Sequence, residues 1–260
     1  MSAVDWDAAS YHRISEPQFR WGMEVLESLE LEGSETVLDA GCGTGRLTAE
    51  LLRRLPRGRV LALDGSQAML DVAQRTLEPL AAGRVELVRA DLQSLGLTAV
   101  ADVLFSTATF HWVLDHDRLF KELFAALKPG GRLHAQCGGE RNLARLEGRV
   151  AKLVGAAPFR PSFEGWRDPH VFAGVEETRH RLVAAGFQDV RVWLEPRPAT
   201  FSDEATFREF IAKVVLRHHL ARVPPGLGDT LLDALVEQAR ADDPPFSLDY
   251  QRLNLRALRP

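Results

Sequence analysis

The chain contains very little cysteine: Cys42 and Cys137 are the only two among its 260 residues. Two cysteines cannot build a disulfide framework, so we expect a reducing compartment, the cytoplasm. The first residues are acidic and contain no apolar stretch of the kind that a secretory signal requires. Apolar runs that approach the ~20 residues of a membrane span are also missing, which predicts no membrane partner.

An excess of positive charge is missing as well. The 32 basic and 36 acidic residues give a formal net charge of -4, so nothing favours nucleic acid as a partner. Hydrophobic residues make up 45% and charged residues 26%, which is typical of a globular protein and excludes disordered and fibrous classes. A chain of this length can bury a full core. Its oligomeric state stays open.

Short apolar segments alternate with amphipathic ones in the first half of the chain. Leu47, Leu51 and Leu55 show the helical spacing, and Ser66 is placed to cap a helix that we expect to end before Pro79. Strand–helix–strand repetition with short links predicts parallel strands and right-handed crossovers, and therefore an α/β doubly wound sheet. The strands are expected at residues 36–40, 59–63, 85–88, 102–105 and 132–137.

The second half is mostly helical around two further strands. After a helix that stops at Gly186, residues 190–194 alternate as a sixth strand, and a last strand at about 246–255 is expected to return antiparallel beside it. Residues 139–172 and 203–245 are interpreted as helical caps over the carboxyl edge of the sheet, where α/β proteins bind ligands. Neither insertion looks large enough to be a separate domain. We therefore expect one domain, 1–260, in which residues 1–32 form an amino-terminal lid and helix.

A glycine-rich segment joins the first predicted strand to the first predicted helix. It contains Gly41, Gly43 and Gly45, with Asp39 at the end of the strand. Glycines there let the backbone pass close to a ligand, and the helix amino terminus favours a negative group. A dinucleotide loop requires Gly-x-Gly-x-x-Gly, whose last position is Arg46 here, which disfavours a nicotinamide oxidoreductase.

The pattern Gly41-x-Gly43-x-Gly45 instead resembles the first motif of the class I S-adenosylmethionine-dependent methyltransferases. Asp64 and the pair Asp91-Leu92 follow the second and third predicted strands, where acids of that family bind the ribose hydroxyls and adenine. The resemblance implies a seven-stranded, mostly parallel sheet and S-adenosylmethionine as cofactor. The cofactor-binding residues that it implies are Tyr11, Arg20, Asp39, Gly41, Cys42, Gly43, Gly45, Asp64, Gly65, Met69, Asp91, Leu92 and Thr107.

A narrower resemblance lies after the fourth predicted strand. Residues 108–116 resemble the trans-aconitate methyltransferase group, although His111 and Leu114 stand where that group has Gln and Pro. Tyr11 and Arg20 resemble the leading segment of the same group. Residues 11–21 are rich in aromatics and arginine and are predicted to fold over the cofactor, with these two side chains near its methionine carboxylate. The alternative is a surface helix whose Phe19 packs on the sheet. It covers about residues 10–137, and beyond Gly138 only the layout of the helical caps is similar.

The methyl acceptor is the open question. A carboxylate is ionised at neutral pH and needs no base, whereas a hydroxyl or an amine reacts better with a base in reach. His111 is the candidate catalytic residue, either as that base or as a substrate contact. We expect transfer to an oxygen of a small molecule. The alternatives are N- or C-methylation of another metabolite, or a protein that holds the cofactor without catalysis. His218 and His219 lack Cys or carboxylate residues at ligand spacing, so no metal is predicted.

Overall fold

The computed structural model describes residues 6–81, 83–224 and 226–260, and these divide into two compact units. The first, called the sheet unit, holds the described residues 6–140 together with 170–195 and 252–260. The second, called the helical unit, holds residues 141–169 and 196–251. The two insertions that we expected as separate caps thus belong to one unit together. The assignment of a single domain stays a prediction.

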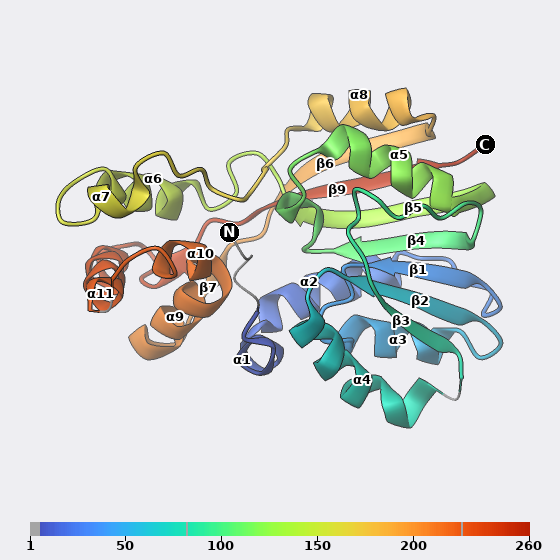
Figure 1. Ribbon diagram of the computed structural model, residues 1–260, viewed down its shortest axis with the longest axis horizontal. Helices are drawn as coiled ribbons and strands as arrows, with labels where there is room; N and C mark the ends of the chain where they lie inside the picture. Colours follow the sequence, from blue (N-terminus) through green and yellow to red (C-terminus); the bar gives the residue numbers. More distant parts are fainter. Residues whose placement is uncertain (1–5, 82, 225) are drawn as a thin grey trace. The chain divides into compact units, whose positions relative to one another are not determined.

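The described residues of the sheet unit build a seven-stranded sheet in the order β3-β2-β1-β4-β5-β9-β6. β1 pairs in parallel with β2 and β4, β4 with β5, and β9 is antiparallel to β5. This confirms the doubly wound, mostly parallel sheet, with its last strand beside the sixth (Figure 1). The strands are β1 (Thr36–Ala40), β2 (Arg59–Asp64), β3 (Val85–Arg89), β4 (Ala101–Thr107), β5 (Leu127–Gly138), β6 (Gln188–Pro196) and β9 (Gln251–Leu258).

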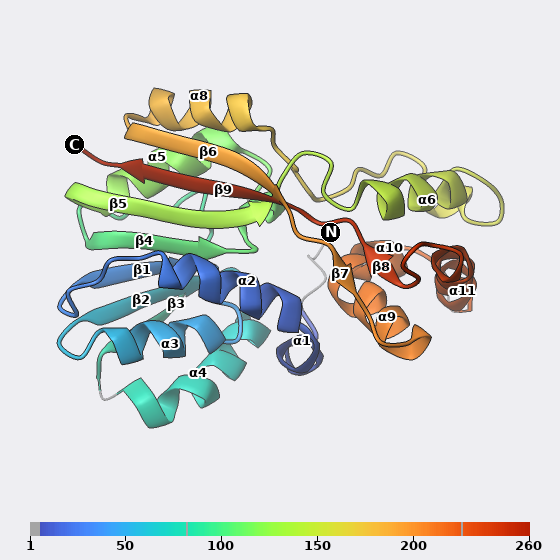
Figure 2. The ribbon, with the colours of Figure 1, turned by 180° about the vertical axis from the view of Figure 1, so that it is seen from behind.

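Helices cover both faces of this sheet, as Figures 1 and 2 show from opposite sides. Successive strand residues point to opposite faces, so neighbouring Val37 and Leu38 belong to two different hydrophobic clusters. Val37 packs with Leu51 of α3 (Arg46–Arg54), in the cluster that also includes α2 (Glu16–Glu27) and α4 (Gln67–Ala81). Leu38 lies in the cluster with Leu123 of α5 (His116–Ala126) and Leu182 of α8 (Val175–Ala185).

Local signals placed most element ends well, and three predicted ends were wrong. α4 continues past Pro79, because its apolar face still packs on the sheet through Leu77 and Leu80. β5 begins at Leu127 instead of residue 132, since Leu127 pairs with Ala101 before an irregularity in the ladder. The last strand of the main sheet begins at Gln251 instead of 246, because β8 (Ser247–Leu248) pairs with β7 (Ala199–Thr200) in a second sheet.

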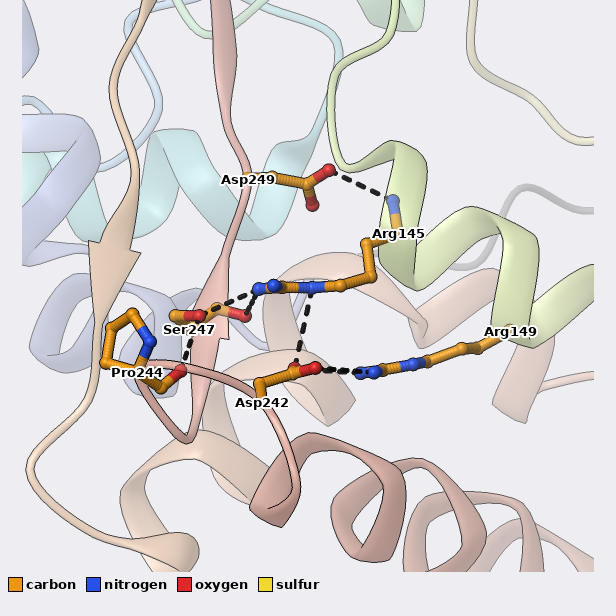
Figure 3. A network of polar contacts seen from close by, with 6 residues as sticks. All are labelled: Arg145, Arg149, Asp242, Pro244, Ser247 and Asp249. Carbon is orange, nitrogen blue, oxygen red and sulfur yellow. Dashed lines mark hydrogen bonds and ion pairs between the residues drawn. The ribbon is translucent and has the colours of Figure 1, made fainter.

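The two insertions of the helical unit are joined by partly buried charged side chains. Figure 3 shows Arg149 of α6 (Ala144–Val154) binding both carboxylate oxygens of Asp242, at 2.9 and 2.6 Å. Arg145 donates to the backbone and hydroxyl oxygens of Ser247, at 2.8 and 2.7 Å. A bidentate arginine–carboxylate pair fixes orientation as well as distance, so residues 144–149 and 242–247 hold each other in place. The other helical segments of this unit are α7 (Arg160–Phe163), α9 (Glu204–Phe210), the π-helical turn Ile211–Val215, α10 (Arg217–Leu220) and α11 (Leu227–Arg240).

Among residues 6–81, 83–224 and 226–260, no helix is both long enough and apolar enough to cross a membrane.

Substitution of two leucines tests which positions contribute to the stability of the hydrophobic core. Leu38 is fully buried at the centre of the sheet, whereas Leu114 is 62% exposed. We expect Leu38→Ala to lower the free energy of unfolding by ~2–5 kcal/mol, because it removes buried surface and leaves a cavity. The matched change Leu114→Ala should stay within ~0.5 kcal/mol. Urea denaturation measures both, and equal losses would contradict this assignment of the core.

Candidate functional site

The glycine-rich loop is held against the end of β2. The backbone amides of Gly41 and Cys42 both donate to the carbonyl oxygen of Leu63, each at 2.8 Å. Gly41, Gly43 and Gly45 have φ values of +86°, +54° and +79°, a region that residues with side chains rarely adopt. The loop then turns into α3, whose amino-terminal cap is Gly45. The three glycines are therefore required by the backbone itself.

Only one of the three glycines borders open space. A Cβ atom on Gly41 would lie 2.1 Å from Oγ1 of Thr109, and one on Gly45 would lie 3.2 Å from Ala73. A Cβ atom on Gly43 would meet no protein atom within 4 Å. Gly41 and Gly45 are thus needed for close packing, whereas Gly43 leaves room beside the loop.

A cavity opens at this loop. It lies between the loop, the end of β4, α2 and α1 (Ala8–Ile14), and so brings Tyr11 and Thr107 to Gly41 and Gly43. These positions agree with the expected cofactor site. The lining residues are Tyr11, Ser15, Gln18, Phe19, Asp39, Gly41, Cys42, Gly43, Thr44, Arg46, Leu47, Thr107 and Ala108.

Arg20, in contrast, is exposed and does not line the cavity. Successive helix residues are rotated by about 100°, so Phe19 faces the cavity and Arg20 faces away from it. The geometry therefore gives no support to the contact expected between Arg20 and a methionine carboxylate. The cation that does line the cavity is Arg46, which stacks on Phe19 at 4.0 Å and donates to Glu16 at 2.9 Å. In the sequence, Arg46 stood out only as a departure from the dinucleotide pattern.

Asp64 connects the glycine loop to the end of β2. One carboxylate oxygen accepts the amide of Gly43 and the other accepts the amide of Ser66, both at 2.9 Å. These two hydrogen bonds orient the carboxylate group of Asp64 at the end of β2.

Asp39 lies deeper, at the end of β1, and is 3% exposed. It accepts a hydrogen bond of 2.6 Å from the hydroxyl of Thr48. Burial raises the pKa of Asp39 to about 7, the Thr48 hydrogen bond opposes this rise, and the charge of Asp64 adds to it. Asp39 therefore changes its charge near neutral pH.

The other expected contacts lie after β2 and β3, outside the cavity lining. Asp91 is exposed, and its Oδ1 accepts the backbone amide of Gln93 at 2.9 Å. Leu92 is buried in the core cluster below it. Met69 is also buried, and its amide donates to the hydroxyl of Ser66 at 3.1 Å, the cap that the sequence indicated. The expected adenosine contacts of these residues and of neighbouring Gly65 stay predictions.

Cys42 is a small lining residue in a negative environment. Burial raises the pKa of its thiol, and the carboxylates of Asp39 and Asp64 raise it further. A thiol is nucleophilic only when ionised, so Cys42 stays a neutral wall of the cavity.

An aromatic cluster lies beside the cavity, in the sheet unit. Trp112, in the 3₁₀ helix Phe110–Trp112, lies 4.2 Å from His170 and 5.4 Å from Trp6, and Trp6 lies 5.0 Å from Tyr11. The amide of Val171 donates to the carbonyl oxygen of His111 at 2.8 Å, which holds the 170–172 segment in place. The sequence indicated Tyr11 and His111, but it contained no signal that Trp6, His170 and Phe172 would lie with them. The cluster consists of Trp6, Tyr11, His111, Trp112, His170 and Phe172.

His111 is 8% exposed, and its protonation state follows from its contacts. Burial lowers its pKa well below the usual range, and the charges of His170, Arg252 and His116 lower it further. The backbone amide of Gly138 donates to Nδ1 of His111 at 3.3 Å. A neutral imidazole whose Nδ1 accepts a hydrogen bond carries its proton on Nε2. The ring therefore presents an N–H donor.

Within the part of the chain that the structure describes, no three His, Cys, Asp or Glu side chains are grouped so as to hold a metal ion.

Comparison with known proteins identifies the family. Residues 37–131 match the family of methyltransferase domains. A trans-aconitate 2-methyltransferase from Azoarcus sp. is 36% identical over 258 residues, which cover 95% of this chain and 94% of that protein. Its namesake from Methylobacterium radiotolerans is 30% identical over 255 residues, covering 96% and 94%. The chain belongs to the trans-aconitate methyltransferase family of class I S-adenosylmethionine-dependent methyltransferases.

Solved structures of other proteins share the fold of this family member. Haemonchus contortus phosphoethanolamine N-methyltransferase 2, in complex with phosphomonomethylethanolamine and S-adenosylhomocysteine, has a TM-score of 0.63 at 20% identity, covering 97% of this chain and 57% of that one. The YcgJ protein from Bacillus subtilis has a TM-score of 0.63 at 16% identity, covering 92% and 97%. At these identities the similarity shows the fold alone.

S-adenosylmethionine is the cofactor of this methyltransferase, and the glycine loop fits it. The space beside Gly43 admits a ligand at the amino terminus of α3, and Asp64 offers oriented acceptors at the end of β2. Tyr11, Phe19 and Thr107 enclose the same space.

Asp64→Ala tests the ribose contact. Removing the acceptor should weaken S-adenosylhomocysteine binding by ~1–3 kcal/mol, as expected for a lost buried hydrogen-bond partner. The control is Asp203→Ala, because Asp203 also accepts a backbone amide, from Thr206 at 2.8 Å, but caps α9 of the helical unit. Calorimetry on the folded variants measures both. Unchanged affinity in Asp64→Ala, or tight NADH binding by the wild type, would contradict the site.

Asp39→Asn tests the buried carboxyl. Because its pKa rises from 3.8 to about 7 on folding, its contribution to stability is full below the lower value and lost as pH rises through the higher one. Asparagine keeps an acceptor for Thr48 without titrating. The stability of the wild type minus that of the variant should therefore fall by up to ~1.4 kcal/mol per pH unit between these values. Urea denaturation across this range measures the slope, and a difference independent of pH would refute it.

Proposed function

We propose that this enzyme methylates a carboxylate oxygen of a small organic acid. The observation that carries the proposal is the hydrogen bond from the Gly138 amide to Nδ1 of His111. It leaves Nε2–H as the polar group that His111 offers to a ligand.

A base role for His111 conflicts with this hydrogen bond. To accept a proton at Nε2, the neutral ring has to carry its other proton on Nδ1, where it would face the amide proton of Gly138. The low pKa of His111 also argues against a base role, because it makes the ring a weak base. A carboxylate acceptor is already ionised and requires no base.

A donor at this position suits a carboxylate. One carboxylate oxygen accepts the Nε2–H of His111, and the other stays available as the nucleophile. Bound S-adenosylmethionine would supply a methyl group on a positively charged sulfur. Transfer to the carboxylate oxygen would form a C–O bond as the C–S bond breaks, with the electron pair of that bond kept by sulfur. The residues contribute orientation and exclusion of water, for which the aromatic cluster provides the walls.

The relatives support the same acceptor. The proteins that match over almost the whole chain are named trans-aconitate 2-methyltransferases, a name that specifies an acid as substrate. The group that residues 108–116 resemble has Gln at the position of His111. A glutamine amide and an Nε2–H imidazole are both hydrogen-bond donors, so the replacement keeps the feature that a carboxylate needs.

For this enzyme we predict a cytoplasmic location, a small-molecule substrate and no nucleic-acid partner. Cys42 and Cys137 are both buried and free, which suits a reducing compartment.

Two substitutions at His111 separate donor from base. A release assay for S-adenosylhomocysteine over small acids, phenols and amines identifies the best acceptor. With that acceptor, His111→Gln should keep kcat within ~threefold, whereas His111→Phe should lower kcat/KM by ~10–150-fold, the loss of a hydrogen bond to a charged group. Any inflection of the wild-type kcat near the ordinary histidine pKa should persist in His111→Gln, because the pKa of His111 lies well below it whereas Asp39 at the cavity has a pKa of about 7.

The control is His134→Gln. His134 is another histidine of low pKa, about 4, on β5, and its pKa is lowered by burial and by Arg256 and Arg132. This change should leave the kinetics unaltered. A 10²–10⁴-fold loss of kcat in His111→Gln, or methyl transfer only to hydroxyls or amines, would contradict the donor role and support a base role for His111.

A further inference from the structure

Arg46 connects the glycine loop to the chain segment that precedes the sheet. It is the first residue of α3, and its Nη2 donates to Oε2 of Glu16 at 2.9 Å. Its guanidinium carbon lies 4.0 Å from the centroid of the Phe19 ring, and its Nη1 donates to the carbonyl oxygen of His12 at 3.5 Å. Residues 8–19, which comprise α1 and the first turn of α2, are called the entry segment. Arg46 therefore contacts both helices of this segment.

A second residue of the loop binds the same segment. Nδ1 of His12 and the hydroxyl of Thr44 share a hydrogen bond of 2.9 Å. Burial lowers the pKa of His12, and the charge of Arg46 lowers it further, so the ring stays neutral at pH 7. Thr44 and Arg46 flank Gly45, the amino-terminal cap of α3. The start of α3 thus holds α1 by one neutral hydrogen bond and one cation.

The position of α1 depends on these contacts. The helix has seven residues, and a helix this short is unstable in water without tertiary support. It meets α2 at Ser15, whose φ of -81° and ψ of 35° lie outside the helical region. α2 itself is fixed on α3 and the sheet, because a Cβ atom on Gly22 would lie 2.3 Å from Cδ1 of Leu47 and Leu26 is fully buried. Ser15 therefore joins a fixed helix to one that side-chain contacts hold in place.

The entry segment forms one wall of the cavity. Tyr11 and Phe19 line it together with Gly43 of the loop. The ring of Tyr11 also lies 5.0 Å from that of Trp6, in the aromatic cluster. The contacts of Arg46 consequently determine whether the wall over the glycine loop is complete.

We infer that Arg46 is a positioning residue that holds the entry segment over bound S-adenosylmethionine and thereby sets the rate at which the cofactor and its product leave. It acts through Glu16, Phe19 and α1, since both of its Nη groups bind the segment. The inference rests on the cavity as the cofactor site. It is independent of the acceptor, so it stands even if the proposed carboxylate acceptor is wrong.

Release of S-adenosylhomocysteine from the whole protein, measured by stopped flow, tests the inference. Arg46→Met removes both the ion pair and the cation over Phe19 and should accelerate release ~3–25-fold. Glu16→Gln removes only the ion pair and should accelerate release ~2–5-fold. The wild-type rate should rise more with added NaCl than that of Glu16→Gln, because salt screens an exposed ion pair. Arg46→Lys keeps the charge, so its rate should be intermediate and still depend on salt.

Hydrogen exchange gives a readout that needs no ligand. The amides of Tyr11 and Ser15 donate to the carbonyl oxygens of Asp7 and Tyr11, at 2.9 and 3.0 Å. In Arg46→Met, exchange within residues 8–19 should become faster while exchange in β1 stays unchanged, because α1 opens locally. A general loss of stability would accelerate exchange in both regions.

5′-Methylthioadenosine, which lacks the amino-acid part of S-adenosylhomocysteine, separates positioning from direct binding. A positioning role predicts that Arg46→Met accelerates the release of both ligands by similar factors. If Arg46 bound the methionine carboxylate itself, only the release of S-adenosylhomocysteine would become faster. Glu16→Gln would then slow this release, because it leaves the guanidinium to the ligand.

Arg53→Met and Glu50→Gln are the matched controls. Arg53 also lies on α3 and forms an ion pair with Glu50, but this pair lies within the helix and outside the cavity lining. Both changes should leave the release rates and the exchange of residues 8–19 unaltered.

Each other outcome overturns the inference. Unchanged release and exchange in Arg46→Met would exclude the positioning role, equal effects in Arg53→Met would assign the change to α3 as a whole, and an effect on S-adenosylhomocysteine alone would make Arg46 a direct ligand contact. If Arg46→Met does not fold, Glu16→Gln decides, because the Glu16 side chain is 70% exposed and its replacement should keep the fold. Release by Glu16→Gln at the wild-type rate and with the wild-type salt dependence would then contradict the inference.

Discussion

The parallel pairing of β1 between β2 and β4 is the constraint on which the site depends. Three residues of β1 are in register with both neighbours, so the carboxyl ends of the strands arrive at one edge of the sheet. Backbone groups at this edge have no further strand residues to bind. The amides of Gly41 and Cys42 turn back onto the carbonyl oxygen of Leu63, and this contact sets the conformation of the glycine loop. Asp64, one residue later, is thereby placed to accept the amide of Gly43.

The chemistry of the site follows from removing a few polar groups from water. Asp39, His111 and Arg252 are all nearly buried, but they respond differently because their partners differ. The pKa values of Asp39 and His111 shift toward the neutral form of each group. A guanidinium keeps its charge in a protein, so Arg252 is stabilised by stacking and by an oriented amide. The result is one neutral donor in the 3₁₀ helix after β4 and one permanent cation on β9.

Backbone and side-chain contacts at the end of β5 couple recognition to the fold. Gly138 is the last residue of β5, binds His111 through its amide and faces Arg252 across the ladder. A shift of register between β5 and β9 by one residue would turn Arg252 to the opposite face of the sheet. The antiparallel pairing of β5 with β9 therefore determines the face of the sheet on which Arg252 lies.

The sequence by itself determined the features that depend on local geometry. The glycine spacing of the loop, the cap at Ser66, the glycine stop at Gly186 and the alternation of strands and helices are short-range properties, and the structure has them in place. Only the tertiary structure decided which side chains meet. It placed Arg46 instead of Arg20 at the cavity, brought Trp6 and His170 to Trp112, and gave His111 its donor proton through Gly138. These contacts join residues far apart along the chain, and they depend on strand register and helix rotation, which no local pattern of residues encodes.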